Sequence, residues 1–148
     1  MNKQTINELR SKYGDAFFLL DEGIFVSNIE QVKLAFANKY DNFSIAYSFK
    51  TNYIPRVCRL ALEQDCMAEI VSDMEYEHAL RVGYQPDQII FNGPIKSPEI
   101  LLKSFENDSI VHFDSEAEID YLEEYLSEPN RKPVRCALRV NFDMKGEK

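Results

Sequence analysis

The sequence has few of the residues that build metal sites or hydrolytic triads. Its 148 residues include two histidines and three cysteines, and Cys58, Cys66 and Cys136 lack the CxxC spacing of a zinc site. Two histidines also leave little from which to form a Ser-His-Asp triad. We therefore expect no metal site and reduced cysteines. Any chemistry must come from lysine, carboxylates or a cofactor.

Positive charge and long apolar runs are also scarce. The chain carries 17 basic against 25 acidic residues, a formal charge of -8, and no basic cluster interleaved with aromatic residues, which argues against a nucleic-acid partner. The run FFLL at 17–20 is too short for a signal-peptide core or a membrane span. We expect a cytoplasmic protein without a membrane or nucleic-acid partner.

The apolar share of 45% and the length predict one domain with a buried core. β-Branched and aromatic runs predict strands at 43–50, 67–71, 88–93, 109–113 and 134–141. Segments of helix length lie between them, at 54–65, 73–83, 97–105 and 114–128. They open with Pro, Ser or Asp at cap positions, and one closes on a glycine.

The N-terminal part departs from this rhythm. A polar helix is predicted first, then a strand pair or strand-turn at 16–25, and then a helix capped by Ser27.

Repeated β-α units predict a parallel sheet, either an open doubly wound sheet or a (β/α)₈ barrel. Neither GxGxxG nor GxxxxGK[ST] occurs, which favours the barrel over a nucleotide-binding open sheet. About five barrel strands are present where a closed barrel needs eight. The fold class is therefore α/β, a partial (β/α)₈ TIM-type barrel.

Lys50 ends the first predicted strand of this sheet, where barrels carry their catalytic groups. A lysine partly withdrawn from water there favours the neutral amine, a nucleophile that attacks an aldehyde. Considered alone, a lysine that extends its amine into solvent is the simpler interpretation.

Five segments in order resemble the fold-type III pyridoxal-phosphate (PLP) decarboxylases, the diaminopimelate and ornithine decarboxylase group. They are AYSFKTN, MAEIVSDMEYEHAL, GYQPDQIIFNGPIKS, HFDSEAEIDYL and LRVN. The resemblance runs from about residue 16 to the end and depends on their order and spacing. It implies pyridoxal 5′-phosphate as cofactor and makes 1–148 the N-terminal, incomplete part of an alanine-racemase-like barrel. PLP acts as the electron sink when an amino acid loses carbon dioxide.

The resemblance also implies roles for individual residues. Lys50 is the Schiff-base lysine and Glu69 a catalytic carboxylate beside it, where the family usually has Asp. Glu75, three residues after Ser72, and Arg139 join Lys50 and Glu69 in the cofactor-binding set. Without the resemblance, Glu69 is interpreted as a carboxylate that faces solvent from the end of a strand. Glu75 is interpreted as a negative charge near a helix N-terminus, where it interacts favourably with the helix dipole.

Three further residues follow predicted strands or end them. His112 is interpreted as a structural histidine, and the Asn92-Gly93 pair as turn residues.

The function implied is decarboxylation of an amino or diamino acid, by a homodimer when the protein is full length. The family's glycine-rich phosphate segment, pyridine-nitrogen partner and C-terminal β-domain do not occur here, so we expect this fragment alone to be inactive. An incomplete barrel also exposes a sheet edge and an apolar face. Two alternatives stay open: an amino-acid racemase on the same barrel, and an inactive homologue or fragment that acts as a binding or regulatory partner.

Overall fold

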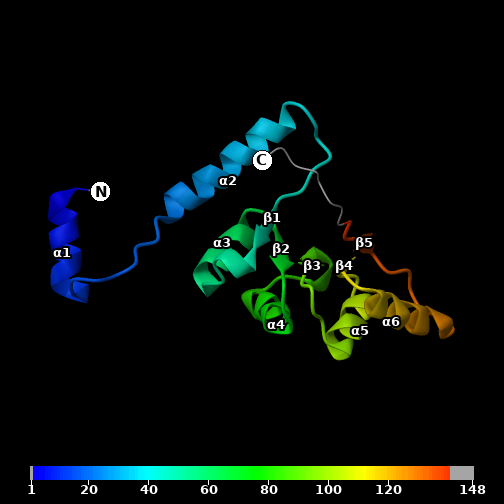
Figure 1. Ribbon diagram of the computed structural model, residues 1–148. Coiled ribbons are helices and arrows are strands. Elements are labelled where there is room, and N and C mark those ends of the chain that lie inside the picture. The colour runs from blue at the N-terminus through cyan, green and yellow to red at the C-terminus, as the bar shows by residue number, and fades with distance from the viewer. Residues whose placement is uncertain (1, 141–148) are drawn as a thin grey trace, which may run out of the picture.

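A computed structural model describes residues 2–140, which form one parallel sheet, four helices along its outer side and two N-terminal helices (Figure 1). The strands are β1 (Ala46–Ser48), β2 (Met67–Ile70), β3 (Ile89–Phe91), β4 (Ile110–Phe113) and β5 (Cys136–Leu138). The helices are α1 (Lys3–Tyr13), α2 (Glu22–Ala37), α3 (Pro55–Glu63), α4 (Asp73–Val82), α5 (Pro98–Glu106) and α6 (Glu116–Ser127), with 3₁₀ turns η1 (Phe49–Thr51) and η2 (Pro86–Gln88).

The strand order is β1-β2-β3-β4-β5, and every neighbouring pair is parallel. One of the helices α3 to α6 lies in each crossover. An open doubly wound sheet reverses its strand order at a switch point, and no reversal occurs among these five strands. The predicted α/β fold with a partial barrel is therefore confirmed, and all five predicted strands are present in shortened form. Residue 141 of the last prediction lies outside the described residues.

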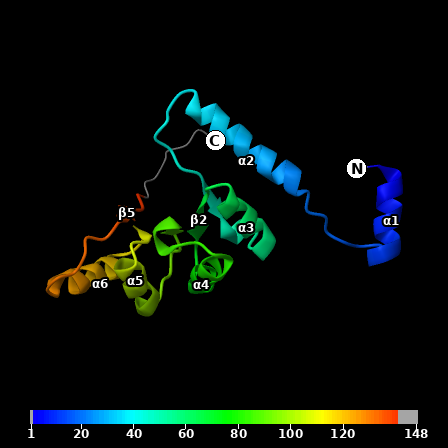
Figure 2. The same ribbon diagram turned by 180° about the vertical axis from the view of Figure 1, so that it is seen from behind.

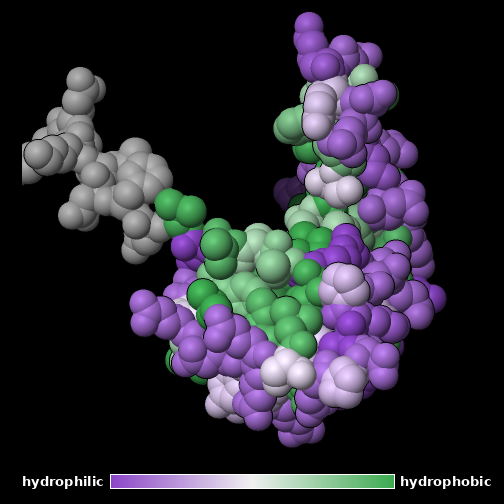
Figure 3. Space-filling view, turned by 90° about the vertical axis from the view of Figure 1, so that its right-hand side faces the viewer, coloured by the Kyte–Doolittle hydropathy of each residue, from purple (hydrophilic) through white to green (hydrophobic). Residues whose placement is uncertain are grey.

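Side chains alternate between the two faces of the sheet, as the pleat requires. Those that face the helices are buried, and they include Ala68, Ile70, Ile89, Phe91 and Val111. Half-buried residues lie between them and point to the inner face: Met67, Glu69, Ile90, Ile110 and His112. Figure 3 shows apolar side chains gathered in a hollow beside the projecting N-terminal segment.

α1 and α2 project away from the sheet and are joined by an extended stretch (Figures 1 and 2). The strand pair predicted at 16–25 is wrong, because α2 already begins at Glu22. The Asp21 carboxylate accepts the N–H of Ile24 at 3.0 Å and caps the helix. Ser27, the predicted cap, lies inside this helix. The helix predicted before this segment is confirmed as α1.

Local signals explain why the helices around the sheet begin and end where they do. Ser72 caps α4 by accepting the N–H of Glu75 at 3.3 Å. Gly83 ends α4 at φ 115°, a left-handed conformation that favours glycine. Ser97 caps α5 and is followed by Pro98 at the first helical position. In residues 2–140, the helices are all too short or too polar to cross a membrane.

Candidate active site at the carboxyl ends of the strands

Polar side chains gather where the strands end. Parallel strands bring their carboxyl ends to one rim of the sheet, where barrel enzymes hold their chemistry. The register pairs Ser48 with Glu69, and Lys50 follows two residues after Ser48. At this rim lie Lys50, Glu69, Asn92, His112 and Arg139, one from each strand or from the residues that follow it.

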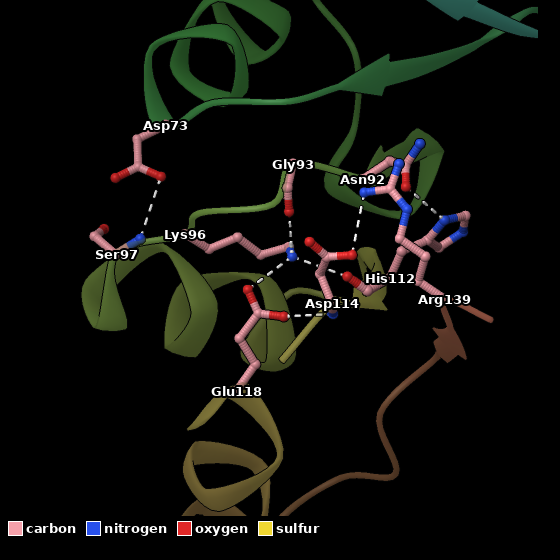
Figure 4. Close-up of polar contacts among 9 residues, drawn as sticks. All are labelled: Asp73, Asn92, Gly93, Lys96, Ser97, His112, Asp114, Glu118 and Arg139. Atoms are coloured by element: carbon pink, nitrogen blue, oxygen red, sulfur yellow. Dashed lines mark hydrogen bonds and ion pairs between the residues drawn. The ribbon is translucent and has the colours of Figure 1, made fainter. Parts of the chain in front are cut away.

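Glu69, Asn92 and His112 are joined by hydrogen bonds across three neighbouring strands. Asn92 donates from Nδ2 to Glu69 Oε1 at 2.9 Å. Its Oδ1 lies 3.1 Å from Nδ1 of His112 (Figure 4). The side chain interpreted from sequence as part of a turn therefore links the predicted catalytic carboxylate to the histidine.

Burial lowers the pKa of His112 below its usual range. The Glu69 carboxylate opposes this effect, whereas the cations Lys96 and Arg139 reinforce it. The imidazole is therefore neutral at neutral pH.

Lys96 is a buried cation beneath this rim, and its role is not predicted from the sequence. Its amine donates to the carbonyl oxygens of Gly93 at 2.6 Å and His112 at 2.8 Å, and to Glu118 Oε1 at 3.0 Å (Figure 4). The Lys96 side chain is 0% exposed and that of Glu118 6%. All three protons of the ammonium thus have acceptors, which a buried charge requires. This pair ties the ends of β3 and β4 to α6.

Arg139 is connected to the Lys96–Glu118 pair through Asp114, the residue after β4. Its Nη1 lies 3.1 Å from Asp114 Oδ1. The backbone N–H of Asp114 donates in turn to Glu118 Oε2 at 2.8 Å. The predicted cation is therefore placed near His112 and connected to the buried pair.

Lys50 lies in η1, directly after β1, and its side chain is exposed. The expected withdrawal from water is wrong for the described residues, because β1 is an edge strand and nothing among them covers its end. The amine makes no hydrogen bond or ion pair within residues 2–140. Nearby, the hydroxyl of Ser48 is buried without a hydrogen-bond partner in the same part of the chain.

Glu75 is 4% exposed and lies in the first turn of α4. Its Oε2 accepts the backbone N–H of Val71 at 2.8 Å. This contact fixes the turn after β2, and the structure shows no link from Glu75 to Glu69 among the described residues. A cofactor-binding role for Glu75 stays a prediction.

Gly93 occupies a position that only glycine fits. A Cβ there would lie 2.1 Å from the carbonyl oxygen of Val71, a backbone atom that has no freedom to rotate away. The absent side chain lets the end of β3 approach the end of β2. Asn92 is thereby brought within reach of Glu69.

Most of the chain matches a known protein family. Residues 26–148 match the family model "Pyridoxal-dependent decarboxylase, pyridoxal binding domain". A diaminopimelate decarboxylase of Methanothermobacter thermautotrophicus is 28% identical over 134 residues, covering 90% of this chain and 30% of its own length.

Two solved structures share the fold. The arginine decarboxylase of Paramecium bursaria Chlorella virus has a TM-score of 0.74 at 21% identity, with 93% of this chain and 35% of its own chain covered. The diaminopimelate decarboxylase of Methanocaldococcus jannaschii has a TM-score of 0.73 at 24% identity, with 90% and 32% covered. This chain spans about a third of the length of these relatives.

The family match covers most of the sequence and takes in all five rim residues. It confirms the resemblance to the fold-type III decarboxylases and the expectation of pyridoxal 5′-phosphate as cofactor. The chain belongs to the family of pyridoxal-dependent decarboxylase pyridoxal-binding domains.

Proposed function

We propose that this chain forms the first part of the barrel of a PLP-dependent amino-acid decarboxylase, of the kind that acts on diaminopimelate, and that Lys50 holds the cofactor covalently through Nζ. The family match and the name of the Methanothermobacter relative support this reaction.

The observation that carries the proposal is the contrast between two lysines near the rim. Lys50 is exposed and its amine has no partner within residues 2–140, so it is free to react. Lys96 is enclosed and donates to three acceptors, so a cofactor aldehyde has no access to its nitrogen. Of these two, Lys50 therefore fits the role of cofactor lysine.

The surroundings of Lys50 fit the same cofactor. Glu69, on the adjacent strand, supplies a carboxylate that balances positive charge. Asn92 holds this carboxylate by a hydrogen bond. The buried hydroxyl of Ser48 lacks a partner in the described structure and offers a hydrogen bond to a ligand. Arg139, exposed at the same rim, provides a cation for anionic groups. When bound, PLP supplies an electron sink for the carbon that loses its carboxylate.

We further propose that the protein works as a homodimer in the cytoplasm. Cys58, Cys66 and Cys136 are free thiols, which suits a reducing compartment. Exposed apolar side chains along α2, among them Ile24 and Leu34, suit a partner surface.

The reaction is tested by supplying the full-length protein, of which this chain forms the first part, with PLP and meso-diaminopimelate and measuring carbon dioxide. We expect release by the wild type and background release by Lys50→Ala, while Lys132→Ala, an exposed lysine outside the site, keeps wild-type activity. Inverted stereochemistry without carbon dioxide would show a racemase instead. Absence of PLP uptake by the wild type would favour the inactive binding partner.

A further inference from the structure

The hydrogen bonds at the rim have a fixed direction. An ionised carboxylate only accepts hydrogen bonds, so Asn92 must present its NH₂ group to Glu69. The amide oxygen of Asn92 then faces His112 and can only accept. Nδ1 of His112 is therefore the atom that carries the proton.

The second histidine of the chain has the opposite arrangement. Nε2 of His78 lies 2.9 Å from the backbone carbonyl oxygen of Tyr53, which only accepts. His78 therefore carries its proton on Nε2. The two histidines are predicted to be opposite tautomers, and each acts as an internal reference for the other.

A neutral histidine protonated on Nδ1 has a lone pair on Nε2. His112 lies on the inner face of β4. The neighbouring strand is β3, and Asn92, which binds Glu69, directly follows it. Burial and the cations Lys96 and Arg139 favour its neutral form, against the carboxylate of Glu69. The rim thus holds a hydrogen-bond acceptor, Nε2 of His112, close to the donor groups of Arg139.

We propose that Glu69 and Asn92 act as positioning residues that hold His112 as the Nδ1–H tautomer, and that its Nε2 accepts a hydrogen bond from the ammonium group of the amino-acid substrate. The pairing of an acceptor with the Arg139 cation matches a substrate that carries both an ammonium and a carboxylate. The substrate-binding part rests on the proposed function, whereas the tautomer does not.

The tautomer is read directly from side-chain ¹⁵N chemical shifts of the full chain labelled with ¹⁵N-histidine, without cofactor. We expect a protonated Nδ1 and unprotonated Nε2 at His112, and the reverse at His78. His78→Gln assigns the signals. A protonated Nε2 at His112 in the neutral wild type would overturn the proposal.

Glu69→Gln tests whether the carboxylate sets the direction. A glutamine amide donates as well as accepts, so Asn92 is free to turn and donate to Nδ1. We expect His112 in this variant to shift toward the Nε2–H tautomer, with His78 unchanged. An unchanged His112 signal would show that Glu69 does not position it.

Substrate binding is tested by steady-state kinetics of the PLP-loaded full-length protein with meso-diaminopimelate. Asn92→Leu should raise KM about tenfold, the effect of one lost hydrogen bond, with a smaller change in kcat. Asn107→Leu, which removes an exposed amide at the end of α5, is the matched control and should leave KM unchanged. An unchanged KM in Asn92→Leu overturns the substrate contact. If the wild type does not turn over this substrate, the proposed function and that contact fall together, while the ¹⁵N result still decides the tautomer.

Discussion

Two lysines near the same rim differ only in their surroundings, and the surroundings decide what each can do. Lys96 has three acceptors and no exposed side-chain surface. Lys50 is exposed, without a partner in residues 2–140. A buried lysine whose three acceptors are all in place serves the structure, whereas an exposed lysine without a partner is accessible to a cofactor.

Replacing Lys96 by Met should destabilise the fold strongly. The substitution leaves the Glu118 carboxylate buried without its cation, which costs about 3–5 kcal/mol. Lys103→Met is the matched control, because Lys103 pairs with Glu77 at side-chain exposures of 39% and 42%. Such an exposed pair contributes at most about 1 kcal/mol.

Urea unfolding of both variants measures the difference. Equal losses in Lys96→Met and Lys103→Met would contradict the structural role assigned to the buried pair.

Part of the site could be predicted from single residues. Lys50, Glu69 and Arg139 end or follow runs with clear strand character, so their place at the rim follows from the parallel sheet. The role of Lys96 could not be predicted, because its burial depends on backbone carbonyls and on Glu118, 22 positions further along the chain. The exposure of Lys50 was also missed, since strand pattern alone does not tell an edge strand from a covered one.

At the level of elements, the first turns of α4 and α6, which follow β2 and β4, also fix the loops that precede them. Glu75 accepts the N–H of Val71, and Glu118 that of Asp114, each at 2.8 Å. The Ser-x-x-Glu pattern at both places predicts a helix start from sequence. It does not predict that these carboxylates also fix the turns at the rim, because their partners precede the serine.

The turn between β3 and α5 depends on Gly93. Alanine there would place Cβ 2.1 Å from the Val71 carbonyl oxygen, so β2 and β3 must separate. We expect Gly93→Ala to lose about 1–3 kcal/mol of unfolding free energy in urea. Gly23→Ala, where the nearest atom lies at 3.5 Å in the first turn of α2, should be neutral or stabilising by at most about 1 kcal/mol. A Gly93→Ala protein as stable as Gly23→Ala would contradict the close approach of the two strands.

The elements themselves were mostly predictable from apolar period and capping residues. The exception is the segment 16–25, whose apolar residues suggested strands. Its structure is set by Asp21, which caps α2. Phe18, Leu19 and Leu20 before it are exposed, Phe18 fully so. The spacing of apolar residues alone does not distinguish a short strand from an extended connection followed by the first turn of a helix.

At the scale of the molecule, the sheet formed by residues 2–140 has two open edges, β1 and β5. Unpaired backbone groups on an edge strand favour association with another chain. Leu138 on β5 is 67% exposed and adds an apolar side chain to this edge.

We therefore expect the 148-residue chain to self-associate in sedimentation experiments. Leu138→Lys, a charge on the edge strand, should shift it toward the monomer. Ile95→Lys, which places the same charge at an 83% exposed loop position, should have little effect. Equal shifts in both variants would show that net charge, and not the edge, controls association.

The central claim is that Lys50 is the lysine that binds PLP. The most direct measurement is borohydride reduction of the full chain after incubation with PLP, followed by mass spectrometry of its peptides. We predict a phosphopyridoxyl group on Lys50, none on Lys96, and no site-specific label in Lys50→Ala. A label on Lys96, or one that persists at this rim in Lys50→Ala, would contradict the account.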